Sequence, residues 1–176
     1  WRMTDVRPWP AGPEDLLLTT RVGRVTEREA WSPIDPDRRG RFVRLRHPAW
    51  VNVVARTTDG DVVFVQQYRH GTESITLEIP GGMVDVGEDP LHAAVRELAE
   101  ETGYVGGTAS LLGSVLVNPA IQDNRCYTAL IDGCHRGGVQ SLDEHEEIAV
   151  HLHPLGSVPD LLRSGLVEHS LVVAAF

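Results

Sequence analysis

Short segments rich in β-branched and other apolar residues recur along the chain, some of them alternating with polar positions, and such segments are typical of β-strands. Segments of this kind lie at residues 16–25, 41–46, 51–57, 62–68, 76–79, 110–117, 127–131 and 148–152. Asp59-Gly60 lies between two valine-rich runs, and an Asp-Gly pair in that place predicts a β-hairpin. The pattern therefore predicts a chain rich in antiparallel strands.

One stretch instead has the spacing of an amphipathic helix. Asp89 is a typical N-cap, Pro90 suits the first helical position, and Gly103 can end the helix in a left-handed conformation. Apolar or small side chains recur between them at Leu91, Ala94, Val95, Leu98 and Thr102. Two more helices are expected, at 158–163 and 169–176. Strands interrupted by a few helices indicate the α+β class.

Length and composition suit one domain with short extensions. The chain has 176 residues, of which 41% are hydrophobic, so a real core is expected. No run approaches the ~18 apolar residues of a membrane helix, and no signal peptide opens the sequence. Cys126 and Cys134 lack CxxC spacing and are expected to be thiols in a reducing compartment. We therefore expect a cytoplasmic protein without a membrane partner.

The charge of the chain is strongly unbalanced. It has 25 acidic residues against 16 basic ones, all of them arginine, which gives a net charge of −9. Binding to nucleic acid or to an anionic membrane surface requires a basic face. The composition therefore argues against both kinds of partner.

Acidic residues gather between positions 78 and 101, where they are opposed by Arg96: Glu78, Asp85, Glu88, Asp89, Glu97, Glu100 and Glu101. On a helix, Glu97 neighbours Glu100 and Glu101, and all three are expected opposite or beside the apolar stripe, without basic partners. Such acids repel one another unless a hard divalent cation binds them. The alternative is an acidic helix face exposed to solvent. A preceding Gly-Gly pair, which lets a backbone approach a ligand, favours the metal site.

The spacing of this region resembles a known family motif. Gly82 is followed by five residues, Glu88, seven residues, and then Arg-Glu-Leu-Ala-Glu-Glu-Thr-Gly-Tyr at 96–104. This matches the Nudix box at every fixed position, with Tyr104 where the family usually has an aliphatic residue. The resemblance implies a Nudix-type α/β/α sandwich with a mixed sheet. It also implies metal-dependent hydrolysis of a nucleoside diphosphate linked to another group, with Mg²⁺ or Mn²⁺.

The resemblance assigns roles residue by residue. The metal ligands would be Glu97, Glu100, Glu101 and the backbone carbonyl of Gly81, with Glu88 close to the metals. Arg96 and Glu88 would hold the loop and helix in place, and the resemblance counts Arg96 and Glu100 among the catalytic residues. Anionic diphosphates repel a nucleophile, so such chemistry requires neutralisation of the phosphoryl oxygens.

Two upstream sequences narrow the resemblance to the ADP-ribose pyrophosphatase and nucleotide-sugar branch. Gln-Tyr-Arg ends at Arg69, and Leu-Glu-Ile-Pro-Gly-Gly runs through residues 77–82. By this resemblance Arg69 contacts the diphosphate, Glu78 lies beside the substrate, and Pro119, fifteen residues after Tyr104, belongs to the substrate site. The alternatives are a strand-edge surface charge for Arg69 and a solvated acid for Glu78.

A second acidic cluster lies at residues 143–147 and resembles the late loop that supplies the catalytic base in this branch. A carboxylate there would take the proton of the attacking water. The position of each acid relative to the following strand, 148–152, favours Glu146 as the base. Glu144 and Glu147 are the other candidates, and a solvated acidic loop is the alternative. His145, His151 and His153 lie nearby, but no zinc spacing joins them.

Some positions leave the substrate open. The sequence lacks the glycine that often follows the proline at 119, and the aromatic candidates for stacking on adenine are Trp9, Trp31 and Trp50. Residues 1–47, a β extension with a proline-rich lead-in, resemble the arm with which this branch forms homodimers. Residues 48–176 would be the hydrolase domain.

The resemblance to this branch implies an enzyme that cleaves the diphosphate of a nucleoside diphosphate sugar such as ADP-ribose. The products would be a nucleoside monophosphate and a sugar phosphate. A nucleoside triphosphate pyrophosphohydrolase and a non-catalytic module that binds nucleotide sugars are the alternatives.

Overall fold

A computed structural model describes residues 6–176 of the chain. These residues divide into two compact units. The N-terminal unit holds the described residues up to Pro48 together with Leu116–Asn124. The main unit holds Ala49–Val115 and Arg125–Phe176.

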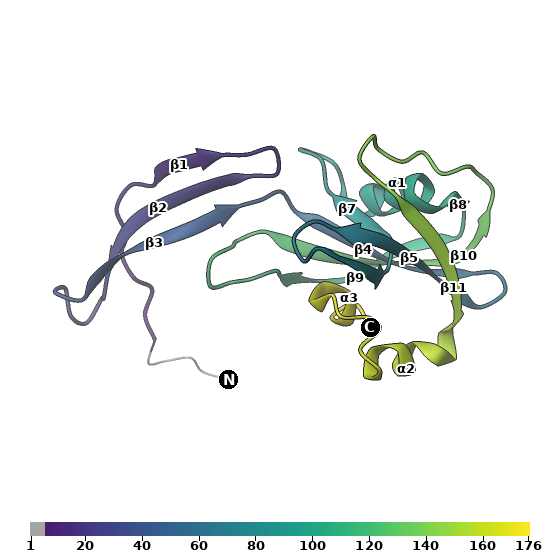
Figure 1. The fold of residues 1–176 in the computed structure, drawn as a ribbon. Helices are drawn as coiled ribbons and strands as arrows, with labels where there is room; N and C mark the ends of the chain where they lie inside the picture. The colour runs from purple at the N-terminus through teal and green to yellow at the C-terminus, as the bar shows by residue number, and fades with distance from the viewer. Residues whose placement is uncertain (1–5) are drawn as a thin grey trace. The chain divides into compact units, whose positions relative to one another are not determined.

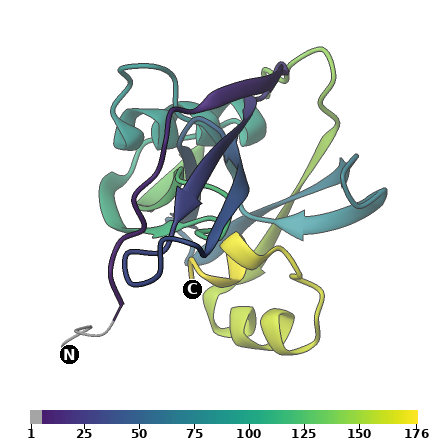
Figure 2. The same ribbon diagram turned by 90° about the vertical axis from the view of Figure 1, so that its left-hand side faces the viewer.

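The N-terminal unit is built on a three-stranded antiparallel sheet in the order β1-β2-β3 (Figures 1 and 2). Its strands are β1 (Asp15–Thr19), β2 (Arg24–Trp31) and β3 (Arg39–Arg46). The predicted single β-rich stretch 16–25 is wrong in its extent. Thr20 and Gly23 close a turn inside it, with Thr20 Oγ1 2.9 Å from the Gly23 carbonyl oxygen. Gly23 favours a turn, and this turn divides the stretch into two strands. The apolar content of the stretch does not by itself indicate the division.

The main unit is built on an eight-stranded mixed sheet. Its path runs β11-β5-β4-β10-β8, with β6 on β5, β7 on β4 and β9 on β10. The strands are β4 (Trp50–Thr57), β5 (Asp61–Arg69), β6 (Ser74–Glu78), β7 (Gly81–Met83), β8 (Tyr104–Val105), β9 (Thr108–Leu116), β10 (Arg125–Arg136) and β11 (Ile148–Pro154). β4 and β10 are parallel, whereas β4–β5, β5–β6 and β5–β11 are antiparallel.

Helices cover this sheet on its two faces (Figure 1). The long helix α1 (Pro90–Thr102) packs Ala93, Ala94 and Leu98 against strand residues such as Val51 and Val53. A second core joins α2 (Val158–Arg163) and α3 (Ser170–Val173) to the opposite side of β4 and β5. A mixed sheet with few helices confirms the predicted α+β class.

The predicted caps of α1 are confirmed. The Asp89 carboxylate accepts a hydrogen bond from the Leu91 amide at 2.8 Å, and Gly103 adopts φ 71°. The helix predicted at 158–163 is confirmed as α2. The helix predicted at 169–176 is shorter than expected, because α3 ends at Val173.

The predicted loop at residues 80–82 contains part of a strand instead. Gly81 and Gly82 pair with Asn52 and Val51 of β4. A Cβ atom on Gly81 would lie 2.2 Å from the Val51 carbonyl oxygen, so this pairing requires a glycine. Glycine contributes nothing to the two-residue hydrophobic period, so the pattern along the chain does not indicate this strand.

Two sequence expectations concern membranes and thiols. Within residues 6–176, no helix is both long and apolar enough to cross a membrane. Cys126 and Cys134 are buried free thiols in β10. Residues 1–5 of the predicted lead-in lie outside the described part of the chain.

Candidate active site

Arg96 of α1 is the centre of an ion-pair cluster. Its guanidinium donates to both oxygens of Glu88 at 3.0 Å, to Glu97 Oε1 at 2.8 Å and to Glu100 Oε2 at 3.0 Å. It also donates to the Met83 carbonyl oxygen at 3.1 Å. The expectation that the helix acids lack basic partners is therefore wrong, because one arginine at helical spacing reaches several of them. These bonds raise the pKa of Arg96, and together with the Asp85 amide they lower the pKa of Glu88 to about 2.

Glu101 lies inside the fold. Its side chain and backbone together are only 4% exposed, and its Oε2 accepts a hydrogen bond from the Gly81 amide at 3.0 Å. Burial is the main cause that raises the pKa of Glu101 to about 8, and the charges of Glu97 and Glu146 add to it. This acid was expected opposite or beside the apolar stripe of the helix; it lies beside the stripe and is buried there, which the helical pattern does not predict. Glu101 follows Leu98 by less than one turn, and β7 covers it there.

Gly82 leaves room for the Glu97 carboxylate. A Cβ atom at position 82 would lie 2.4 Å from Glu97 Oε1 and 2.7 Å from Oε2. Glu97 is partly buried, and this desolvation raises its pKa despite the hydrogen bond from Arg96. The two glycines of β7 thus lie directly against the carboxylates of Glu97 and Glu101.

Arg69 and Glu78 form a bidentate pair across β5 and β6. The distances are 2.8 Å from Nε to Oε1 and 2.7 Å from Nη2 to Oε2. The Glu78 side chain is 3% exposed and the Arg69 side chain 43%. Burial alone would raise the pKa of Glu78, but hydrogen bonds from Arg69 and from the Thr76 hydroxyl, at 2.7 Å, lower it. Glu78 is therefore a buried anion that holds the guanidinium of the half-exposed Arg69 side chain.

Thr76 was missed at the level of the sequence. It lies two residues before Glu78 on β6, so the two side chains are on one face of the strand. A hydroxyl two residues from a candidate carboxylate in a strand is the signal that could have identified it.

Glu146 is brought to the same region by the pairing of β11 with β5. Ile148, the first residue of β11, lies opposite Gln67 in this antiparallel pair. The loop residue Glu146, two positions before Ile148, therefore precedes the strand at the end where β5 reaches Arg69. The negative charge of Glu146 raises the pKa of Arg69, Glu97 and Glu101. Glu144, Glu146 and Glu147 are all exposed. The structure thus brings Glu146 together with the predicted helix acids and with Arg69.

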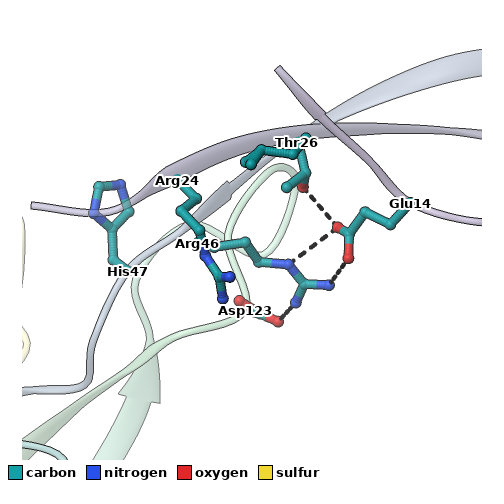
Figure 3. A pocket seen from close by; sticks show the side chains of 7 residues that line it. Glu14, Arg24, Thr26, Arg46, His47 and Asp123 are labelled. Atoms are coloured by element: carbon teal, nitrogen blue, oxygen red, sulfur yellow. Dashed lines mark hydrogen bonds and ion pairs between the residues drawn. The ribbon is translucent and has the colours of Figure 1, made fainter. Parts of the chain in front are cut away.

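Pro119 lies in the segment Leu116–Asn124 of the N-terminal unit, whereas the other predicted site residues belong to the main unit. The N-terminal unit has an open pocket of its own of about 450 Å³, lined by Glu14, Leu16, Arg24, Thr26, Arg46, His47 and Asp123 (Figure 3). Arg46 bonds both Glu14 and Asp123 there. None of the predicted site residues lines this pocket.

The donors of the main unit suit a hard divalent cation in their chemistry. Glu97, Glu100 and Glu101 offer carboxylate oxygens, and two of these carboxylates lie against the glycines of β7. In the described part of the chain, however, no three His, Cys, Asp or Glu side chains form a group that could hold a metal ion. Two of these carboxylates, those of Glu97 and Glu100, accept hydrogen bonds from Arg96. The residues therefore fit a metal by type, and a cation would compete with Arg96 for them.

Comparisons with known proteins identify the family and the fold. A family model described as NUDIX domain matches residues 45–174. The ADP-ribose pyrophosphatase of Bacillus subtilis (strain 168) is 34% identical over 88 residues, which are 50% of this chain and 48% of the relative. The ADP-sugar pyrophosphatase of Mus musculus is 37% identical over 130 residues, which are 72% of this chain and 51% of the relative.

A solved structure described as an ADP compounds hydrolase superposes with a TM-score of 0.85 at 22% identity, covering 98% of this chain and 92% of that one. This agreement shows the fold. The matches to the curated relatives span about half of their length. Because the family model covers most of the sequence, the resemblance inferred from the box is confirmed, and the chain belongs to the NUDIX domain family.

Proposed function

We propose that this chain is a pyrophosphatase that hydrolyses the diphosphate bond of nucleoside diphosphate sugars such as ADP-ribose. The products are a nucleoside monophosphate and a sugar phosphate. The observation that carries the proposal is that one unit holds the oriented Arg69–Glu78 pair together with Glu97 and Glu101, whose carboxylates lie against the two glycines of β7. The names of the two relatives, which act on ADP-ribose and on ADP-sugars, support this substrate class.

Arg69 binds the diphosphate in this proposal. Its Nε and Nη2 bond the buried Glu78, which fixes the plane of the guanidinium. The remaining N–H groups of the half-exposed side chain can then donate to phosphate oxygens, a contact for which the planar fork of arginine is well suited. Glu78 therefore acts by orienting Arg69, and Thr76 by holding Glu78. Pro119 remains a proposed substrate contact from the resemblance.

The acids of the main unit divide into a metal set and a base. A divalent cation, Mg²⁺ or Mn²⁺, would be held by Glu97, Glu100, Glu101 and the Gly81 carbonyl with Glu88 nearby, and it would neutralise phosphoryl oxygens and acidify water. Glu146 takes the proton of the attacking water, with Glu144 and Glu147 as rivals. Arg96, through its bonds to Glu88 and to the Met83 carbonyl, fixes the loop before α1.

The proposal is tested with a panel of nucleotide sugars and nucleoside triphosphates, with products identified by mass spectrometry. We expect Mg²⁺-dependent release of a monophosphate from a nucleotide sugar. Glu101→Gln should lower turnover by at least about 10- to 100-fold, whereas Glu168→Gln at an exposed position should not change it. Full turnover of Glu101→Gln would contradict the site assignment.

The two alternatives have their own outcomes in this panel. Preferred cleavage of triphosphates would indicate a nucleoside triphosphate pyrophosphohydrolase. Tight binding of a nucleotide sugar without turnover in any divalent metal would indicate a binding module.

We also propose that residues 1–47 form a dimerisation arm and that residues 48–176 form the hydrolase domain. β1 exposes Leu16, Leu17 and Leu18, which supports a partner for this strand.

Cytoplasmic location is the third proposal, supported by the buried free thiols of Cys126 and Cys134, since reducing compartments keep cysteines unpaired.

A further inference from the structure

We infer that Gln140 is a positioning residue that ties the acidic loop 143–147 to the acid-bearing end of α1. The inference rests on the proposed function, because it takes Glu146 of that loop as the catalytic base. Gln140 itself touches none of the reacting groups of the proposed reaction. Its effect on catalysis would pass through the position of Glu146.

The side chain of Gln140 joins two elements. Its Nε2 donates to the backbone carbonyl of Glu101 at 2.7 Å and to that of Ile148 at 3.1 Å. Glu101 belongs to the last turn of α1, and Ile148 is the first residue of β11. Both N–H donors of the amide group are thus used by backbone carbonyls, one on α1 and one on β11.

The backbone around Gln140 closes the end of α1 in the same way. The last carbonyls of a helix have no partners within the helix. Here the Ser141 amide donates to the Glu100 carbonyl at 2.8 Å, and the amides of Gly137 and Gly138 donate to the Gly103 carbonyl at 3.2 and 3.0 Å. The segment 137–141 therefore lies along the C-terminal end of the helix that carries Glu97, Glu100 and Glu101.

These contacts fix both ends of the acidic loop. Ser141 anchors its start to α1, and Gln140 holds the carbonyl of Ile148 at its finish. Inside the loop, the Asp143 amide donates to Glu146 Oε2 at 3.1 Å, and the Glu146 amide donates to the Asp143 carbonyl at 3.0 Å. A loop whose ends are held has fewer conformations to search. Glu146 is itself exposed, so its placement relies on this anchoring.

The anchoring of the acidic loop matters because Glu146 interacts electrostatically with the acids of α1. Gln140 and Ser141 bond the backbone carbonyls of Glu101 and Glu100, so the start of the loop is held at the turn of α1 that carries these acids. The charge of Glu146 also acts on Glu97 and Glu101. Misplacing a catalytic group by 1 Å can cost on the order of 10²-fold in rate. Loss of the Gln140 bonds should therefore lower kcat and leave substrate binding through Arg69 largely unchanged.

The test compares Gln140→Ala and Gln140→Glu in two backgrounds, the natural sequence and Glu146→Gln. Glutamate at this position keeps the shape of the side chain but removes both donors and sets an anion against two carbonyls. In the natural background we expect kcat to fall by about 10- to 100-fold with KM changed less than about 3-fold. In the Glu146→Gln background the same changes should cost less than about 3-fold, because coupled residues are not additive. Gln66→Ala, an exposed glutamine on β5, is the matched control.

Equal losses in both backgrounds, an unchanged kcat, or an effect on KM alone would overturn the inference. A fully active Glu146→Gln would overturn it too, since Gln140 would then have no base to position. Absence of turnover in the natural sequence would instead contradict the proposed function. In that case amide hydrogen exchange decides: Gln140→Ala should speed exchange at Ser141 and Glu146 but not inside α1, and unchanged exchange there overturns the inference.

Discussion

At the scale of single residues, Gly82 shows how tightly the proposed site is built. The residue is a fixed position of the box, and the structure gives it a steric reason. Any Cβ at position 82 would lie within 2.7 Å of both oxygens of Glu97. Glu97 also bonds Arg96 at 2.8 Å, so its carboxylate is held from one side by a cation and limited on the other by the backbone of β7.

Replacing Gly82 by alanine should therefore lower turnover more than stability. The added methyl group must displace the Glu97 carboxylate, and a shift of this size can cost on the order of 10- to 100-fold in rate. The melting temperature should change by only a few degrees, because a flexible side chain can move away. Initial rates on the best nucleotide sugar and thermal unfolding measure the two effects.

Gly113→Ala is the matched control for Gly82→Ala, since a Cβ atom at position 113 would have no heavy atom within 4 Å apart from those of its own residue and its two chain neighbours. It should leave both rate and melting temperature close to those of the natural sequence. A Gly82→Ala variant that turns over as fast as Gly113→Ala would contradict the assignment of Glu97 to the site.

At the scale of elements, the sequence predicts the features that depend only on residues close together along the chain, such as helix caps and apolar spacing. The caps Asp89 and Gly103 and the apolar spacing between them define α1, and the structure has this helix with both caps. β7 was not predicted, since Gly81 and Gly82 carry no pattern and their pairing with β4 depends on close backbone approach.

The pairs that assemble the site are also outside the reach of local patterns. The sequence singles out Arg69 and Glu101 as site residues. It does not predict that Glu101 is buried and bonded to the Gly81 amide, twenty residues away. Arg96 is the common partner of three acids. Its bond to Glu100 could be predicted from helical spacing. Its bond to Glu88 requires the path of the loop before the helix.

The exposed leucines of β1 give a prediction for the N-terminal arm. We expect the chain to sediment as a dimer, and a Leu16→Glu/Leu18→Glu variant to sediment as a monomer at the same concentration. Both side chains are more than half exposed, so the change should disturb an interface rather than a core. Analytical ultracentrifugation gives the masses. Leu166→Glu, at an equally exposed site of the main unit, should remain a dimer. A monomeric natural sequence would contradict the proposed arm.

At the scale of the whole molecule, the acid excess has a definite place. Residues 78–101 carry seven acids and one arginine, and residues 143–147 carry four acids, so the remaining sequence is nearly balanced although the net charge is −9. In the main unit these two stretches interact electrostatically, because the charge of Glu146 acts on Glu97 and Glu101. Burial and mutual repulsion raise the pKa of Glu101 to about 8, so the unbound protein holds acids that are costly to ionise.

A cation bound by these acids should therefore stabilise the fold. A ligand at 100 times its Kd adds about 2.7 kcal/mol, which for a chain of this length corresponds to a melting temperature higher by roughly 5–10 °C. Thermal unfolding in saturating Mg²⁺ and in excess chelator, at matched ionic strength, measures the difference. Glu101→Gln should reduce the shift, because it removes one carboxylate from the set, whereas Glu168→Gln should keep it. An equal melting temperature of the natural sequence with Mg²⁺ and with chelator would contradict a metal site built from these residues.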